Sequence, residues 1–151
     1  MGDGALFAYG SLVVEEVMRA VTGLCPVSEH ARLPGYLCRR LRGRSYPGIV
    51  PSAERDDDGR LVEAEGRLYR GVDDGVFALL DDFEGPLYVR TGVGVATASG
   101  AVACFTYVLD TACSNELSDG RWSVEDFVRQ DLEEFLAECR SFAAERRVIA
   151  R

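Results

Sequence analysis

Histidine is almost missing from this chain of 151 residues, which holds only His30. A Ser-His-Asp or Cys-His enzyme would depend on that one side chain, and no nucleophile lies near it in a recognisable elbow. The residue stands at the start of a strand-like run near proline and glycine, where a surface or half-buried structural histidine is the simpler interpretation. The sequence therefore argues against nucleophilic catalysis that relies on histidine.

The patterns that hold metals and nucleotides are missing as well. Five cysteines occur without CxxC or other metal spacing, and a single histidine does not complete a zinc site. No glycine-rich segment matches a Walker or dinucleotide pattern. The acidic segment 56–59 lacks the spaced ligands and closing glutamate of an EF-hand, so we interpret it as a solvated hairpin turn. We expect neither a metal nor a cofactor.

Long apolar runs are also missing. No charged stub followed by an apolar run opens the chain, which argues against a signal peptide, and no stretch approaches the ~20 apolar residues that span a bilayer. Cys38, Cys104 and Cys139 fall in apolar strand-like or helical patterns, where reduced thiols pack as small hydrophobic groups. We therefore expect a reducing compartment and a cytoplasmic protein.

Positive charge is in deficit, because 17 Lys and Arg stand against 25 Asp and Glu for a formal charge of −8. Such a balance repels phosphate backbones and anionic lipid surfaces, so neither nucleic acid nor membrane is an expected partner. The one basic cluster, the arginines within residues 39–44, follows the period of a strand. We interpret it as a solvated strand edge rather than an anion-binding patch.

The remaining composition is that of an ordinary folded domain, with 47% hydrophobic and 28% charged residues. Residues 1–151 fit one domain without a repeat or linker. Periodicity predicts strands and helices, the strands at 5–9, 30–41, 61–72, 88–98 and 101–109 and the helices at 13–21, 73–83 and beyond 123. The βαβ alternation of a nucleotide-binding fold is missing. We predict an α+β fold with a mostly antiparallel, curled sheet.

The last predicted helix starts at Ser123, which together with Asp126 gives a cap-like beginning. Apolar residues recur at helical spacing as far as Phe142 and form one stripe. We expect this helix to pack on the sheet, with its stripe serving as core rather than as a cofactor groove.

Two segments carry candidate chemistry, and the first is the turn Tyr9-Gly10-Ser11-Leu12 after the first predicted strand. Glycine permits a backbone in which successive N–H groups point into a concave anion-binding nest. The following helix adds the positive end of its dipole. Such a turn can hold a carboxylate without a cationic side chain, although a structural loop explains the same residues.

The second segment is an acidic helix end with Asp81, Asp82 and Glu84, terminated by Gly85-Pro86. The negative end of the helix dipole disfavours acids at this position, so their presence invites an explanation. A solvent-exposed acidic helix end is the plain alternative. An apolar, aromatic surround would raise the pKa of the Glu84 carboxyl towards neutrality, which suits a group that shuttles protons.

The order of these segments resembles a known family. The Tyr-Gly-Ser-Leu turn is followed by Tyr46-Pro47, then by Leu-Asp-Asp-Phe-Glu-Gly at 80–85 and Tyr-x-Arg at 88–90. Over roughly residues 5–109 this pattern is similar to the gamma-glutamylcyclotransferase-like proteins, and most of all to the gamma-glutamylamine cyclotransferase and AIG2-like branch. The resemblance implies a barrel-like sheet flanked by a few helices, with a cavity at the end of the first strand.

The resemblance also implies an activity. Family members of this type release 5-oxoproline from gamma-glutamyl compounds, so the expected partner is a small gamma-glutamyl amine, peptide or metabolite. The family's binding loop falls on Tyr9, Gly10, Ser11 and Leu12, and its catalytic glutamate, a general acid and base, on Glu84. Serine stands where this branch commonly has threonine, a departure that keeps the hydroxyl.

Further candidates come from the strands beyond Glu84. Tyr88 and Tyr107 could line the cavity, although aromatic strand residues more often belong to the core. Arg90 is expected to pair with a carboxylate rather than to touch the substrate. The alternative to an enzyme is a non-catalytic module of the same fold that binds a small carboxylate.

Overall fold

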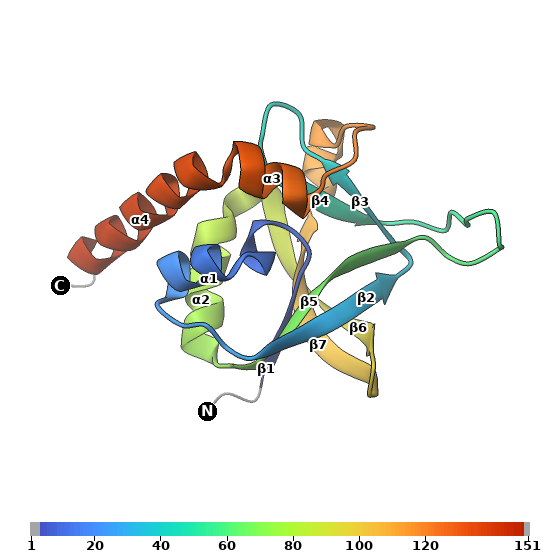
Figure 1. Cartoon of the computed structure of the whole chain (residues 1–151), viewed down its shortest axis with the longest axis horizontal. Helices are drawn as coiled ribbons and strands as arrows, with labels where there is room; N and C mark the ends of the chain where they lie inside the picture. Colours follow the sequence, from blue (N-terminus) through green and yellow to red (C-terminus); the bar gives the residue numbers. More distant parts are fainter. Residues whose placement is uncertain (1–3, 150–151) are drawn as a thin grey trace.

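A closed five-stranded barrel forms the centre of the structure, a computed structural model that describes residues 4–149 (Figure 1). The strands follow one another around the barrel in the order β1-β5-β2-β6-β7. Their bounds are β1 Gly4–Ala8, β2 Ser28–Pro34, β5 Glu63–Val72, β6 Tyr88–Thr97 and β7 Gly100–Leu109. All neighbouring pairs are antiparallel except β1 and β7, which run parallel. The predicted α+β fold with a curled, mostly antiparallel sheet is confirmed.

A separate two-stranded sheet lies beside the barrel and consists of β3 (Tyr36–Arg40) and β4 (Pro47–Pro51). The predicted strand 30–41 bends at Pro34-Gly35, as expected, and the part after the bend, β3, leaves the barrel to pair with β4. Prolines at both ends of β4 suit a strand with one partner, because proline has no N–H to donate to a second ladder.

The α-helices gather on one side of the barrel, while one short 3₁₀ helix, η3 (Thr111–Glu116), lies beside the two-stranded sheet (Figure 1). The α-helices are α1 Glu15–Thr22, α2 Asp74–Glu84, α3 Val124–Gln130 and α4 Leu132–Ile149, and the other 3₁₀ helices are η1 Ser11–Val13 and η2 Gly85–Leu87. The side chain of Ser123 accepts a hydrogen bond from the Asp126 N–H (3.1 Å), so the predicted cap is confirmed. The predicted helix 13–21 starts later than expected because η1 precedes it.

Two apolar clusters hold these layers together. One lies between the barrel and the helices and contains Val17, Phe77 and Phe127, while the other lies among the strands. Strand β1 is buried on both faces, because Leu6 belongs to the first cluster and Phe7 to the second. The end of β1 is therefore fixed between two packed layers, which makes it a rigid support for the turn that follows.

The last helix differs from the prediction. It is broken at Asp131 into α3 and α4, and α4 lies over α1 and the end of α2 instead of on the sheet (Figure 1). The ring of Phe142 contacts that of Phe83 on α2, with their centroids 5.4 Å apart. Val128, part of the expected stripe, is 46% exposed. The prediction was wrong because α1 and α2 already cover the helix side of the barrel.

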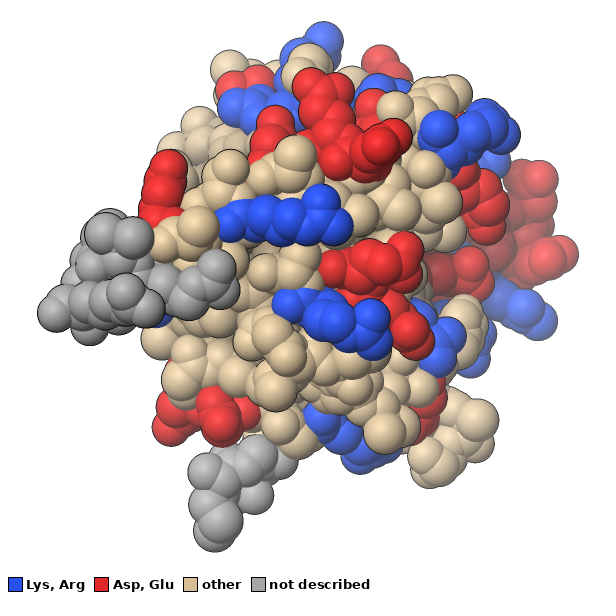
Figure 2. All heavy atoms as spheres, turned by 60° about the vertical axis from the view of Figure 1, so that its left-hand side comes forward, with Lys and Arg blue, Asp and Glu red and all other residues tan. Residues whose placement is uncertain are grey.

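The surface carries both signs of charge. Figure 2 shows acidic and basic side chains side by side over one face, and exposed ion pairs such as Arg32–Glu63 (3.5 Å) and Arg70–Glu29 (3.4 Å) join strands of the barrel. Exposed pairs of this kind each contribute about 0–1 kcal/mol. Of the helices within residues 4–149, none is both long and apolar enough to cross a membrane.

Candidate active site

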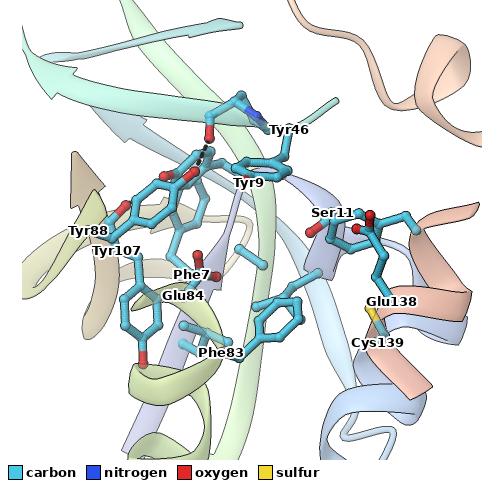
Figure 3. A pocket seen from close by; sticks show the side chains of 16 residues that line it. Phe7, Tyr9, Ser11, Tyr46, Phe83, Glu84, Tyr88, Tyr107, Glu138 and Cys139 are labelled. Atoms are coloured by element: carbon cyan, nitrogen blue, oxygen red, sulfur yellow. Dashed lines mark hydrogen bonds between the residues drawn. The ribbon is translucent and has the colours of Figure 1, made fainter. Parts of the chain in front are cut away.

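One cavity collects every residue that the sequence predicted for the site (Figure 3). It has a volume of about 180 Å³ and lies where β1 and α2 end, beside the flank of α4. The predicted residues in its wall are Tyr9, Gly10, Ser11, Leu12, Glu84, Tyr88 and Tyr107. Three segments that are remote from one another in the sequence, at residues 9–12, 84–88 and 107, thus contribute to the same wall.

Gly10 is required here for its size rather than for its backbone freedom. Its φ of −122° and ψ of −135° are not the left-handed conformation of a glycine nest, so that expectation was wrong. A Cβ at this position would lie 2.9 Å from Cδ and 3.0 Å from Cγ of Pro47. Carbon atoms normally approach to about 3.5–4 Å. Glycine therefore lets the turn lie directly against the start of β4.

The backbone amides of the turn are nevertheless available to a ligand. Within η1 the N–H of Val13 donates to the Gly10 carbonyl (3.0 Å), but among residues 4–149 no acceptor is found for the N–H groups of Gly10, Ser11 and Leu12. The start of a helix leaves its first N–H groups unpaired in this way. These three residues line the cavity. The donors come from η1 and not from α1, which begins only after it.

The three acids at the end of α2 differ in their surroundings. Asp81 forms an ion pair with Arg90 (3.2 Å from Oδ1 to Nε), which confirms that this arginine pairs with a carboxylate, and Asp82 pairs with Arg146 on α4. Glu84, the last residue of α2, lies in the cavity (Figure 3), and its carboxyl has no ion-pair or hydrogen-bond partner among the described residues. An exposed acidic helix end therefore describes Asp82 but not Glu84.

Burial raises the pKa of the Glu84 carboxyl from 4.5 to about 8. The residue keeps some contact with solvent through the mouth of the cavity, but protein atoms surround the carboxyl and no cation offsets the cost of charging it. Removal from water disfavours the charged form of a carboxyl. Gly85 fixes the position of Glu84, because its φ of 72° ends the helix and turns the chain away.

Two tyrosine hydroxyls beside Glu84 are held by backbone carbonyls. Tyr88 donates to the carbonyl of Pro47 (2.7 Å), and Tyr9 donates to the carbonyl of Tyr107 (2.6 Å). Burial raises the pKa of both phenols, and the nearby Glu84 contributes to the increase. Both groups therefore stay neutral and form a fixed aromatic wall around the carboxyl.

Tyr107 lines the cavity, but its hydroxyl is not free for a ligand. It donates to Oδ1 of Asp81 (2.7 Å), which is also the oxygen that contacts Arg90. The guanidinium of Arg90 lies over the ring of Phe77, 4.8 Å from its centroid. Tyr107 thus contributes a ring and a backbone carbonyl to the site, while its hydroxyl holds the last turn of α2.

The sequence prediction missed the part of the wall that α4 supplies. Phe135, Glu138 and Cys139 line the cavity from this helix, and Tyr46 and Pro47 line it from the start of β4. Two of the α4 residues belong to the predicted apolar stripe, but helical spacing alone does not distinguish a stripe that covers core from one that covers a cavity. Only the Tyr-Pro pair had a signal, as part of the family pattern.

Metal ligands are not grouped in the described part of the chain: no three His, Cys, Asp or Glu side chains gather as one metal ion would require. The five cysteines are free, and burial raises the pKa of the Cys139 thiol to about 12, so it stays protonated. The groups that face the cavity are the desolvated carboxyl of Glu84, the more exposed carboxylate of Glu138, backbone amides and aromatic rings.

A barrel whose first strand ends in free amides, opposite a desolvated carboxyl at a helix end, is a candidate site for acid–base chemistry on a small polar ligand. A sequence profile of the family described as "Gamma-glutamyl cyclotransferase, AIG2-like" matches residues 6–124. The chain belongs to this family.

Individual relatives agree with this assignment. AIG2-like protein C from Arabidopsis thaliana is 32% identical over 145 residues, which cover 95% of this chain and 80% of the relative. AIG2-like protein D from the same plant is 30% identical, with 93% and 90% covered. A solution structure from Arabidopsis thaliana has a TM-score of 0.67 at 29% identity, with 89% and 87% covered. A structure named "Gamma-glutamyl cyclotransferase" has the same fold (TM-score 0.61, 17% identity, 89% and 98% covered).

Proposed function

We propose that this protein is a gamma-glutamyl cyclotransferase that releases 5-oxoproline from a gamma-glutamyl amine, peptide or metabolite. One observation carries the proposal: the carboxyl of Glu84 has a pKa raised to about 8, lacks a partner among the described residues, and shares a cavity with free backbone amides. Membership of the family supports the same reaction type.

The substrate supplies both reacting groups in this reaction. Its α-amine attacks its own γ-carbonyl carbon, so that a C–N bond closes the five-membered ring and the old amide C–N bond breaks. Holding the chain in a folded pose supplies much of the rate, because well-oriented intramolecular reactions reach effective molarities of roughly 10⁵–10⁸ M. The narrow aromatic wall around Glu84 suits this task, since it leaves little room for an extended substrate.

The protons balance with a single carboxyl. Glu84 as carboxylate takes one proton from the α-ammonium, which makes the amine nucleophilic. The same proton then passes from the carboxylic acid to the nitrogen of the leaving amine as the tetrahedral intermediate collapses. The regenerated carboxylate takes the second proton from the ring nitrogen, so that the lactam keeps one N–H, and this proton is released with the leaving amine, which departs as an ammonium ion. A pKa of about 8 suits both steps, because a group that titrates near the working pH both accepts and returns a proton readily.

The free amides of the turn are placed to donate hydrogen bonds to a negatively charged group of the substrate. The N–H groups of Gly10, Ser11 and Leu12 would hold the α-carboxylate or the oxyanion of the tetrahedral intermediate, while Tyr9, Tyr88 and Tyr107 shape the wall. Backbone donors fixed in advance stabilise such charge without reorganising during the reaction. No step of this route needs a metal or a nucleotide, and five free cysteines are consistent with a reducing, cytoplasmic setting.

The variant Glu84→Gln tests the proposal. It keeps the shape of the side chain but removes the proton carrier, so we expect kcat/KM to fall by about 10²–10⁴-fold. The measurement is 5-oxoproline release from a panel of gamma-glutamyl amines, gamma-glutamyl dipeptides and glutathione, with circular dichroism to verify folding.

Asp82→Asn is the matched control for this test. It removes a neighbouring carboxylate from the same helix end, but one that pairs with Arg146 instead of lining the cavity. We expect this control to turn over the substrate at the parent rate. Normal turnover by Glu84→Gln would contradict the assignment.

The alternative function is ligand binding by the same amides without catalysis. A module that binds a small carboxylate at the turn would be stabilised by panel members against heat, yet would release no 5-oxoproline from any of them. The raised pKa of Glu84 favours the enzyme, because a plain carboxylate-binding site gains nothing from a second carboxyl inside it.

A further inference from the structure

A second hollow adjoins the cavity on the side of α4. It has a volume of about 470 Å³ and shares three lining residues, Tyr46, Phe135 and Glu138, with the cavity that contains Glu84. The shared residues form the boundary between the two spaces. The rings of Tyr46 and Phe135 pack edge to face with their centroids 6.0 Å apart, so a ligand too long for the inner cavity would have to enter the outer hollow past Glu138.

The proposed reaction fixes which part of a substrate would lie in each space. The α-amine and the γ-carbonyl must both lie near Glu84, which places the gamma-glutamyl half in the inner cavity beside the turn. Away from β1 and the tyrosine wall, the cavity is bordered by the three residues that it shares with the outer hollow, together with Pro47, Phe83 and Cys139. The leaving amine therefore extends past Glu138 into the outer hollow.

Glu138 is placed to act on that leaving group. It is exposed on α4, and its side chain reaches towards the turn that carries Ser11 (Figure 3). Among the described residues its carboxylate forms no ion pair, in contrast to Asp82 at the end of α2. A carboxylate at the boundary, free of a protein partner, attracts a cation and repels an anion.

The other charges around the outer hollow do not cancel this effect. Arg44 lies in the hollow but contacts Glu116 (3.6 Å), which leaves Arg40 as the other guanidinium in its wall. Opposite stand Asp131 and Glu134 in addition to the boundary carboxylate. The net charge of the lining is therefore negative, and Glu138 is the acidic member that also lines the inner cavity.

We infer that Glu138 determines specificity for the leaving group and selects gamma-glutamyl conjugates whose leaving amine carries a second, positively charged group. This inference rests on the proposed cyclotransferase activity. Conjugates of diamines fit the site, whereas conjugates whose leaving amine carries a carboxylate meet repulsion at the boundary. Glu138 takes no part in proton transfer and acts through charge on the part of the substrate that leaves.

Three probes of similar length test the inference: gamma-glutamyl conjugates of 1,4-diaminobutane, of 1-aminopentane and of 4-aminobutanoate. All three release 5-oxoproline, and they differ in the charge at the far end of the leaving amine. We expect the parent protein to prefer the cationic probe over the anionic one in kcat/KM by about tenfold or more at low salt, with the ratio shrinking as salt screens the charges.

The variant Glu138→Gln should lower this cation-to-anion ratio by about three- to tenfold, as expected for one partly exposed charge. Glu133→Gln is the matched control, because Glu133 lies on the same helix and is exposed but lines neither space, and it should keep the parent ratio. A parent protein without charge preference, or a Glu138→Gln variant that keeps it, would overturn the inference.

The neutral probe separates this inference from the proposed activity. Release of 5-oxoproline from the neutral probe without any charge preference leaves the cyclotransferase standing and removes the role of Glu138. If no probe is turned over, calorimetric dissociation constants of the three probes decide: a cation preference that Glu138→Gln abolishes supports the selectivity without the chemistry. Equal binding of all three probes, or no binding, overturns it.

Discussion

Asp82 and Glu84 lie close together at the end of α2, where Asp82 pairs with Arg146 and Glu84 has no partner among the described residues. Both side chains lie at the negative end of the helix dipole, which makes a carboxylate there less stable. The ion pair offsets this electrostatic cost for Asp82, whereas burial increases the cost of charging Glu84. Two carboxyl groups on the same helix end thus differ in their charge state because one is paired at the surface and the other is buried.

This difference predicts a pH dependence of turnover. In the proposed reaction the carboxylate form of Glu84 acts first, and the pKa of this carboxyl is raised to about 8, so kcat/KM should rise with pH towards about 8. Below that value it should fall about tenfold per pH unit, because the fraction of carboxylate falls in that proportion. The measurement is the rate of 5-oxoproline release between pH 5 and pH 9. A rising limb centred near the ordinary carboxyl value of 4.5 would contradict the assignment.

The same pKa shift predicts a pH-dependent stability. Between pH 4.5 and about 8 the folded protein keeps the proton on Glu84 and the unfolded chain loses it, so the free energy of unfolding should fall as pH rises. Glu84→Gln removes this loss and should be more stable than the parent at pH 9 by roughly 2–5 kcal/mol, with little difference at pH 4. Urea titrations at the two pH values measure this. An equal difference at both values would show that the carboxyl is not desolvated.

At the scale of elements, Tyr107 connects the segments that form the site. Its carbonyl accepts the hydrogen bond from Tyr9 at the end of β1, and its hydroxyl donates to Asp81 one turn before Glu84. One residue of β7 therefore sets the distance between the turn with the free amides and the helix end with the carboxyl. We therefore expect Tyr107 to position these two segments rather than to bind substrate through its hydroxyl.

Tyr107→Phe tests this connection. It removes the bond to Asp81 but keeps the carbonyl that holds Tyr9, so we expect a loss of about 1–2 kcal/mol in the free energy of unfolding. We also expect kcat to fall more than KM rises, because the carboxyl is displaced while the amides stay in place. Tyr36→Phe is the control, since no hydrogen bond of the Tyr36 hydroxyl is found in the described structure. Equal effects of the two variants would argue against the positioning role.

The parts of this arrangement that depend on neighbouring residues were predictable from the sequence. The hairpin of β6 and β7, the bend at Pro34-Gly35 and the cap at Ser123 follow from turn and cap residues. The family pattern placed the turn and the helix end that carries Glu84 in one predicted site. The contact between Gly10 and Pro47 was not predictable, because it depends on the placement of a distant strand.

The position of α4 was the largest error, and its cause is physical. An apolar stripe shows that a helix is covered on one face but does not identify the covering element. Here the covering elements are α1 and α2, and the uncovered part of the face borders a cavity through Phe135 and Glu138. Hydrophobic periodicity therefore could not identify Glu138, the residue that we propose selects the leaving group.

At the scale of the whole molecule, the barrel order places β1 opposite the junction of β2 and β6. Side chains reinforce the closure beside the site, because Thr106 donates to the Phe7 carbonyl (2.9 Å) and Tyr9 donates to the next strand as well. The opposite junction, like that of β1 and β7, has a single register pair, here Arg32 with Ala96, but among the described residues no side-chain hydrogen bond joins its two strands. The two junctions therefore differ in their side-chain hydrogen bonds.

Backbone amides at these two junctions should exchange their hydrogens at different rates. In native-state hydrogen exchange, amides at the junction of β2 and β6 should lose protection through local opening, while those of β1 and β7 should exchange only with global unfolding. Uniform protection around the barrel would contradict this. Local opening at the junction of β2 and β6 would leave β1 and β7 paired, and so would leave unchanged the distance between the amides of the turn and the carboxyl of Glu84.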